Sequence, residues 1–232
     1  EFETSDPDEI DLLIGESRQL NLTVKVSGNP LTDTILWMSS DEAVAMVTEA
    51  GLIQTIGYGC VEVTAYCRGF SKKFTVSVWT KYISSKDDFF TIYDNLNGWY
   101  RFVDDIELFA NEMKTISQKN IKSLENGGAL FTGVIDGNGH TLSGDNERLF
   151  YLTRGSVIKN LHIKTIGRMW MGVFAEEGEE DLIENVTVEI TLNNTWSFNN
   201  NADWFVRSSG ILFNFARGVT FKDCNVYVSF NE

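Results

Sequence analysis

The chain has 232 residues and a net charge of −14, with 33 Asp and Glu residues against 19 Lys and Arg residues. This balance excludes a general nucleic-acid-binding protein and disfavours anionic membrane surfaces, because both partners require clustered basic side chains. Hydrophobic residues make up 43% of the chain, which is enough for a globular core. No apolar run approaches the roughly 18 residues that span a bilayer, so we expect no membrane insertion.

The few cysteines and histidines argue against a metal site. Cys60 and Cys67 are seven residues apart on one expected strand, so their side chains point to opposite faces and should not form a disulfide. His140 and His162 are the only histidines, and no cysteine pair has metal-ligand spacing. We therefore expect no cofactor and interpret all three cysteines, including Cys224, as packing or solvent-exposed thiols.

The first 80 residues consist of short runs in which apolar and polar residues alternate, separated by Gly, Asn, Asp and Ser. Such runs are typical of β-strands. The expected strands are Ile10–Leu13, Ser17–Val26, Ile35–Ser39, Val44–Val47, Leu52–Thr55, Val61–Cys67 and Phe70–Trp79. Seven short strands favour a two-sheet sandwich. Between Val61 and Tyr66, the odd-numbered residues are expected to be buried and the even-numbered residues exposed.

Several segments of this region resemble the bacterial Ig-like domain of group 2, in the order found in that family. These segments are Ile14–Ser17 with Leu20, Leu36–Asp41, Val44–Val47, Gly51–Ile53, Gly57–Ala65 and Phe74–Val78. The resemblance implies an Ig-like β-sandwich over residues 1–80 that acts as a spacer or adhesion module of a surface protein. In this interpretation Trp37 fills the core between the sheets, and Gly51, Gly57 and Gly59 allow turns with positive φ.

The character of the sequence changes near residue 80, which we interpret as a domain boundary. Tyr82–Phe90 predicts a short strand followed by a helical turn capped by Ser or Asp, and Trp99–Val103 predicts another strand. Asp104 and Asp105 are neighbours on an expected strand, so their side chains should point apart. They are therefore not expected to act as a catalytic pair.

An internal repeat runs from Leu130 to the end of the chain. Each copy has an apolar pair, at Leu149–Phe150, Val173–Phe174 or Ile211–Leu212. The pair is followed by a six-residue strand unit, and these units are Ile158–Ile163, Ile183–Val188 and Phe221–Val226, with starts 25 and 38 residues apart. Positions one, four and six of the unit are expected to point inward. Position three, which is Asn160, Asn185 or Asp223, is expected at a bend where its side chain bonds backbone groups of neighbouring coils.

This repeat predicts a β-solenoid, because each copy can bury its apolar side only against neighbouring copies. The segment Phe131–Leu142, which contains Asp136, Gly137 and Gly139, resembles the first coil of surface proteins of the pectin-lyase-like superfamily, including those with GLUG-type repeats. The resemblance implies a right-handed parallel β-helix over residues 81–232. The expected fold class is thus all-β, and we expect the β-helix to be truncated at its C-terminal end, because the sequence stops just after a strand unit.

An enzymatic role finds little support in the sequence. Many parallel β-helices cleave acidic polysaccharides, but no set of carboxylates and bases suited to that reaction is recognisable here, so no catalytic residue and no metal ligand is predicted. Asp136 is interpreted as a turn residue that binds local backbone donors. Glu176–Asp181 is interpreted as a solvated loop between coils. Calcium at Asp136–Gly139 or at this acidic run, and catalytic coils beyond residue 232, stay open as alternatives.

Three tryptophans, Trp170, Trp196 and Trp204, fall in or beside the long segments between coils, where they could stack on a glycan or cover the core. Our first hypothesis is a non-catalytic cell-surface or secreted structural and adhesion protein of a bacterium, whose Ig-like spacer presents the β-helix to a glycan or protein partner. The alternatives are a carbohydrate-binding or polysaccharide-lyase-like module and a phage fibre or tail component.

Overall fold

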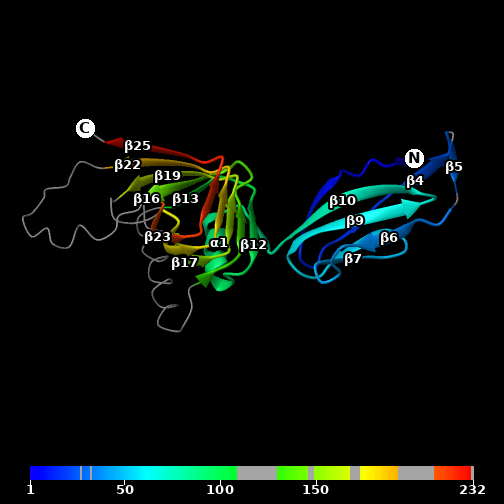
Figure 1. Ribbon diagram of the computed structural model, residues 1–232, viewed down its shortest axis with the longest axis horizontal. Helices are drawn as coiled ribbons and strands as arrows, with labels where there is room; N and C mark the ends of the chain where they lie inside the picture. Colours follow the sequence, from blue (N-terminus) through cyan, green and yellow to red (C-terminus); the bar gives the residue numbers. More distant parts are fainter. Residues whose placement is uncertain are drawn as a thin grey trace, which may run out of the picture. The chain divides into compact units, whose positions relative to one another are not determined.

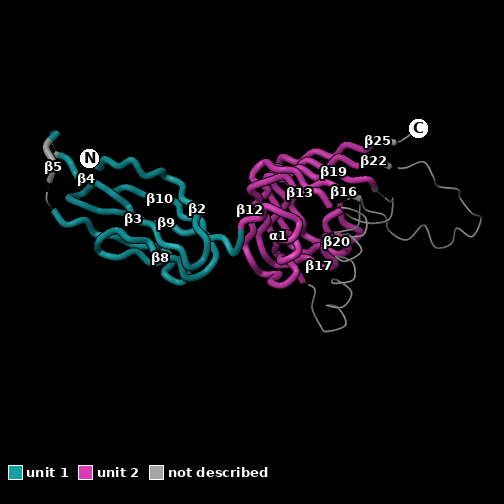
Figure 2. Tube along the Cα trace, turned by 180° about the vertical axis from the view of Figure 1, so that it is seen from behind, with its two compact units in different colours: residues 1–81 teal, residues 82–232 magenta. Residues whose placement is uncertain are grey.

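The computed structural model describes residues 1–26, 28–31, 33–108, 130–145, 149–167, 173–192 and 212–230. The described chain is mostly β-strand and divides into two compact units, unit 1 (Glu1–Lys81) and unit 2 (Tyr82–Glu232) (Figures 1 and 2). No helix in the described part is long and apolar enough to cross a bilayer.

Unit 1 is built from short strands in mainly antiparallel sheets. The strands are β1 (Phe2–Glu3), β2 (Glu9–Leu13), β3 (Ser17–Gln19), β4 (Thr23–Val26), β5 (Asn29–Leu31), β6 (Leu36–Ser39), β7 (Ala45–Val47), β8 (Leu52–Thr55), β9 (Gly59–Cys67) and β10 (Phe70–Trp79). Their orders are β2-β10-β9-β6, β3-β8-β7 and β1-β4-β5, and β2 runs parallel to β10. All seven expected runs contain strands, but Ser17–Val26 is divided between β3 and β4, which belong to different sheets.

The core of unit 1 contains apolar residues from β2, β7, β8, β9 and β10. Phe74, Val76 and Val78 alternate with polar residues along β10 and are completely buried, and they belong to one cluster with Ile53 of β8. Phe74 is therefore a fully buried ring in this core. Trp37 itself is only partly buried and packs against this cluster, with its ring centroid 6.4 Å from that of Phe74.

Two details of unit 1 differ from the sequence-based expectation. Thr64, expected on the exposed side of β9, is buried. Gly51 and Gly59 have positive φ values of 78° and 151°, but Gly57 does not. A Cβ at Gly57 would lie 2.8 Å from the carbonyl oxygen of Ala43, so glycine is needed there for space.

Unit 2 begins with a strand and two short helices, β11 (Lys81–Ile83), α1 (Lys86–Phe90) and the 3₁₀-helix η1 (Thr91–Asp94). The strands that follow are β12 (Trp99–Phe102), β13 (Ile106–Leu108), β14 (Leu130–Phe131), β15 (Val134–Asp136), β16 (Thr141–Asp145), β17 (Phe150–Arg154), β18 (Val157–Lys159), β19 (His162–Gly167), β20 (Ala175–Glu179), β21 (Leu182–Glu184), β22 (Thr187–Leu192), β23 (Phe213–Arg217), β24 (Thr220–Lys222) and β25 (Asn225–Phe230). From β12 onward, every described pair in this unit is parallel.

The described strands of unit 2 form three sheets. Sheet I has the order β11-β12-β15-β18-β21-β24, sheet II the order β13-β16-β19-β22-β25 and sheet III the order β14-β17-β20-β23. The chain passes through sheets III, I and II and then repeats this path. We call each passage a turn: the first turn is β12–β13, the second β14–β16, the third β17–β19, the fourth β20–β22 and the fifth β23–β25. This stack of parallel strands is compatible with a β-helix.

The pairing register follows the repeat. Ile158 pairs with Ile183, and Ile183 pairs with Phe221, as the offsets of 25 and 38 residues predict. Positions one, four and six of the first two strand units are buried, as expected: Ile158, Leu161, Ile163, Ile183, Val186 and Val188 are each at most 4% exposed. The equivalent positions of the fifth turn are not buried, because they lie on the last described strands of the stack.

Helices α1 and η1 cover the core at the first turn. Ser85 caps α1 by accepting a hydrogen bond from the backbone N–H of Asp88, which satisfies one of the free amides of the first turn of the helix. Phe89 and Ile92 are completely buried in the same apolar cluster as Phe102 of β12. The Phe89 and Phe102 rings meet edge to face, with centroids 6.3 Å apart.

Two predictions for unit 2 are wrong: the register of two apolar pairs and the structure of the acidic run. Phe150 pairs with Ala175, and Ala175 pairs with Phe213, so the equivalent apolar pairs are Leu149–Phe150, Phe174–Ala175 and Leu212–Phe213, one residue later than expected in the last two copies. The acidic run Glu176–Asp181 is not a solvated loop. Its first four residues lie in β20, and Asp181 is 1% exposed.

A ladder of polar side chains follows the bend between sheets I and II. Asn160, Asn185 and Asp223 each have φ of 52°, a left-handed conformation that Asn and Asp tolerate better than most residues. The Nδ2 of Asn185 donates to Oδ1 of Asn160 (2.9 Å), and the Nδ2 of Asn160 donates to Oδ1 of Asp136 (3.0 Å). These side chains therefore bind one another, whereas the sequence-based expectation was contact with backbone groups.

This ladder predicts that Asn185→Ala destabilises unit 2 by about 1 to 2 kcal/mol, because alanine is strained at positive φ and loses the bond to Asn160. Asn185→Gly should cost less, since glycine adopts this φ freely. Hydrogen exchange of unit 2 gives the loss of stability in each of the two variants, and hydrogen exchange of unit 1 in the same sample is the internal reference. Equal losses in the two variants would show that backbone conformation is not the cause.

Candidate functional site

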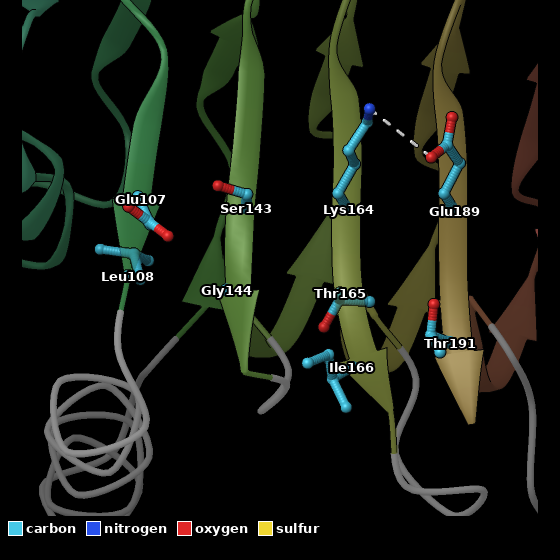
Figure 3. Close-up of a pocket in the computed structure, with 9 residues that line it drawn as sticks. All are labelled: Glu107, Leu108, Ser143, Gly144, Lys164, Thr165, Ile166, Glu189 and Thr191. Atoms are coloured by element: carbon cyan, nitrogen blue, oxygen red, sulfur yellow. Dashed lines mark ion pairs between the residues drawn. The ribbon is translucent and has the colours of Figure 1, made fainter. Parts of the chain in front are cut away.

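A shallow depression of about 340 Å³ lies on the outer face of sheet II (Figure 3). Its lining residues come from four neighbouring strands, β13, β16, β19 and β22, and are mostly polar. They are Glu107, Leu108, Ser143, Gly144, Lys164, Thr165, Ile166, Glu189 and Thr191. The depression is therefore built from four successive turns of the stack.

Strand alternation places the polar residues on this face. Leu142, Ile163 and Val188 point into the core and are buried. The residues that follow them, Ser143, Lys164 and Glu189, point outward, and parallel pairing puts these three in one row with Glu107 of β13. Adjacent strands are roughly 4.8 Å apart, so this row brings side chains from four turns within reach of one ligand.

A small charge network crosses this row. One carboxylate oxygen of Glu189 lies 2.9 Å from Nε2 of His162. The other lies 3.7 Å from Nζ of Lys164 (Figure 3). His162 and Lys164 are two residues apart on β19, so both face the same side. The network places hydrogen-bond donors beside an acceptor on an open surface, an arrangement suited to polar recognition.

Gly144 shapes the floor of the depression. Its φ is 150°, and a Cβ built there would lie 2.0 Å from the carbonyl oxygen of Leu108. Glycine is therefore required by the close approach of β13 to β16, and the floor has no side chain at this point.

A second depression of about 460 Å³ lies on the outer face of sheet III. Its lining residues come from β14, β17, β20 and β23 and are Leu130, Leu152, Thr153, Arg154, Glu177, Gly178, Glu179, Asn214, Phe215, Ala216 and Arg217. Glu179 contacts Arg154 (2.6 Å) and Arg217 (3.6 Å) from the turns on either side. The charges on this face thus pair between turns.

The same alternation of charge runs through the stack. In the second turn, residues 130–145 contain two Asp and no Lys or Arg; in the third, residues 150–167 contain one Arg, two Lys and no acid. In the fourth, residues 175–192 contain six Glu, one Asp and no base, whereas residues 213–230 of the fifth contain one Arg, one Lys and one Asp. From the second turn to the fifth, adjacent turns therefore carry charges of mainly opposite sign.

Sheet I shows the longest row of alternating charges. Its members pair in register in the order Arg101, Asp136, Lys159, Glu184 and Lys222. Oδ2 of Asp136 lies 3.3 Å from Arg101 and 3.7 Å from Lys159, and Lys222 donates to Glu184. The row places the two acids between basic residues of the neighbouring turns.

The hydrogen bond from Lys222 lowers the pKa of Glu184 below the usual 4.5. Since the folded-state pKa is depressed, the pair favours the folded state above pH 4.5, and this contribution is lost as pH falls through the folded pKa. NMR titration of the Glu184 carboxyl should give a midpoint below 4.5 that rises in Lys222→Gln. Lys164→Gln is the control, because Lys164 contacts Glu189; an equal rise there would contradict the assignment.

Asp136 is the last residue of β15, where a turn residue was expected, and its carboxylate is well satisfied. Oδ1 accepts from the backbone N–H of Asn138 (2.9 Å) and from Nδ2 of Asn160. Oδ2 faces Arg101 and Lys159, so the carboxylate that was considered for calcium already has cationic partners.

Asp104 and Asp105 lie in the bend between β12 and β13, so the expectation that they belong to one strand is wrong. The backbone N–H of Thr141 donates to Asp105 (2.8 Å) and lowers the pKa of that carboxyl, with His140 as a further partner. The bend is thereby joined to the second turn.

None of the three cysteines lines the depression on sheet II. The cysteines are free: Cys60 is exposed, Cys67 buried and Cys224 partly buried. Trp170, Trp196 and Trp204, which were considered for glycan stacking, lie outside the described residues. Sequence reasoning did not identify Ser143, Lys164 or Glu189 as site residues.

Within the described residues, no group of three or more His, Cys, Asp or Glu side chains is placed to hold a metal ion. No model of a known protein family matches the chain, and no curated protein does. Its function is therefore inferred from its own geometry.

Proposed function

We propose that this chain is a non-catalytic structural and adhesion protein of the bacterial cell surface or of the secreted fraction. Unit 1 is an Ig-like sandwich that serves as a spacer, and unit 2 is a right-handed parallel β-helix that presents its outer faces to a partner. The observation that carries this proposal is the in-register pairing of opposite charges between successive turns. In this pairing, the charged residues of the outer faces stabilise the contact between neighbouring turns, which is a structural role.

The same pairing weakens the enzymatic alternative. A glycoside hydrolase needs two carboxylates that share one substrate bond, and one of them must carry a proton. In the described residues, Asp136, Glu179 and Glu184 each contact an Arg or Lys from a neighbouring turn. Such contacts give each carboxylate a basic partner from another turn and therefore suit a structural role better than a shared catalytic site.

Carbohydrate binding at the depression on sheet II is the second candidate. Sugars require several donors and acceptors beside a small apolar surface. Ser143, Lys164 and Thr191 supply donors, Glu189 supplies an acceptor, and the exposed side chain of Ile166 supplies apolar area. This candidate places the ligand across the turns, on the rigid face of the sheet.

One pair of variants tests both candidates. In Lys164→Ala/Glu189→Ala, an ion pair of the depression is removed without a change in net charge. Arg154→Ala/Glu179→Ala removes an equivalent pair between the same two turns on sheet III and is the control. Each protein is applied to a glycan array, to acidic polysaccharides with detection of cleaved ends, and, on beads, to host cells and matrix proteins.

If the adhesion proposal is right, beads that carry the unaltered chain or either double variant should attach to cells or matrix proteins. None of the three proteins should cleave polysaccharide or bind a glycan through the depression. A glycan hit that is lost only in Lys164→Ala/Glu189→Ala would replace it with the carbohydrate-binding function. Cleavage that depends on Glu189 would overturn the non-catalytic assignment.

A further inference from the structure

Both histidines of the chain lie at the start of sheet II, in successive turns of the stack. His140 precedes β16 in the second turn, and His162 is the first residue of β19 in the third. The backbone N–H of His162 donates to the carbonyl oxygen of His140 (3.1 Å). The two residues are therefore direct neighbours, although 22 residues separate them in the sequence.

Each imidazole contacts a carboxylate of a further turn. Nδ1 of His140 lies 3.3 Å from Oδ1 of Asp105 in the first turn. Nε2 of His162 lies 2.9 Å from Oε1 of Glu189 in the fourth turn. We call Asp105, His140, His162 and Glu189 the histidine row. It has one member in each of the first four turns, with the two imidazoles between the two acids.

The members of the histidine row act on one another electrostatically. The pKa of Asp105 lies below its usual value, chiefly because the backbone N–H of Thr141 donates to it, and both His140 and His162 contribute. Asp105 therefore stays ionised in the range around pH 6.5 in which histidine ordinarily titrates. The side chains of His140 and His162 are 31% and 27% exposed, so both can exchange protons with the solvent.

The other charged groups on the neighbouring elements are of types that ordinarily titrate below about pH 5 or above about pH 10. They are Asp104 in the bend before β13, Glu107 on β13 and Lys164 on β19, together with Arg101, Asp136 and Lys159 on the strands of sheet I. Lys164 lies 3.7 Å from the second carboxylate oxygen of Glu189. Histidine is the side chain that ordinarily changes its charge between pH 5 and 8.

We propose that the histidine row is a pH-sensitive switch that strengthens the contacts between the first and second turns and between the third and fourth turns in mildly acidic solution. Protonation converts the contacts with Asp105 and Glu189 into charge-assisted hydrogen bonds, which are stronger than neutral ones. This stabilisation is present while the imidazoles are protonated and is lost as the pH rises and the protons leave. The acid at each end of the row offsets the repulsion between the two imidazolium groups. The inference does not depend on the adhesion role.

Hydrogen exchange of the intact chain at pH 5.5 and 7.5, corrected for the intrinsic exchange rates, tests the switch. The amide of Thr141 donates to Asp105 and reports the contact between the first and second turns. The amide of Thr187 donates to the carbonyl oxygen of Leu161 and reports the contact between the third and fourth. We expect protection of both amides to be about two- to fivefold higher at pH 5.5, because partly exposed ion pairs have modest effects. Strands β9 and β10 of unit 1, which contains no histidine, should show no change.

Substitution of each histidine assigns the effect. His162→Gln should abolish the pH effect at Thr187, and His140→Gln should abolish most of it at Thr141, because glutamine keeps a hydrogen-bonding side chain that does not titrate. Lys164→Gln is the matched control. It removes the neighbouring contact of Glu189 with a cation, and the pH effect at Thr187 should remain.

Three results would overturn the proposal. Equal protection at the two pH values in the unaltered chain would show that the row does not respond to protonation. An unchanged pH effect in His140→Gln/His162→Gln would assign it to other groups. Lower protection at pH 5.5 would show that repulsion between the two charged imidazoles exceeds their attraction to Asp105 and Glu189.

Discussion

Replacement of Asp181 by alanine is expected to destabilise unit 2 by about 3 kcal/mol or more, because the buried carboxylate is held by three donors. The hydroxyl of Thr153 donates to it at 2.6 Å, and the backbone N–H and hydroxyl of Ser156 donate at 2.9 and 2.8 Å. All three donors belong to the third turn, so their loss separates the third turn from the fourth. Asp181→Asn should cost less, since it keeps one acceptor oxygen.

Hydrogen exchange of β18 and β21 measures this loss, and unit 1 serves as the internal reference. Glu177→Ala is the matched control, because it removes the same charge from an exposed position of the same turn. It should change stability by no more than about 0.5 kcal/mol. A comparable effect in the two variants would show that charge, and not the buried contacts, determines the result.

The second large effect is expected for Gly137→Ala, at about 3 kcal/mol, the upper end of the usual cost of overpacking. A Cβ at this position would lie 2.5 Å from the carbonyl oxygen of Asn160 and 2.6 Å from Cα of Leu161. Both atoms are backbone atoms of the next turn. The added methyl group can therefore be accommodated only if the two turns move apart.

Gly139 provides a control only two residues away. It has a positive φ of 83°, but a Cβ there would have no neighbour within 4 Å. Gly139→Ala should therefore cost only the backbone strain of about 1 kcal/mol. Thermal unfolding of the two variants separates the requirement for space from the requirement for φ, and a larger loss in Gly139→Ala would contradict this division.

The sequence predicts much of the fold, because strand alternation and the repeat offset are local signals. The offset of 25 residues places Ile158 beside Ile183. It also separates Arg154 from Glu179, Lys159 from Glu184 and Lys164 from Glu189, three pairs of opposite charge. This recurring spacing of opposite charges predicts the charge rows on sheets I and III and the pair Lys164–Glu189 on sheet II. The sequence-based predictions did not use it.

Other features depend on the neighbouring turn and could not be derived from local sequence. The run Glu176–Asp181 has the composition of an exposed loop, yet Arg154, Thr153 and Ser156 of the third turn supply the partners that let it enter a sheet and a buried bend. The register of the apolar pair also depends on the neighbouring turn, and the pair predicted at Val173–Phe174 begins one residue too early. Both members are buried, so hydrophobicity alone does not define the register.

The different ends of unit 2 give its unfolding a direction. Helix α1 closes the first turn, whereas the fifth turn has a neighbour on only one side among the described residues. Because each turn contacts only its neighbours, opening of the stack should advance one turn at a time, and it should not begin at the turn that α1 closes.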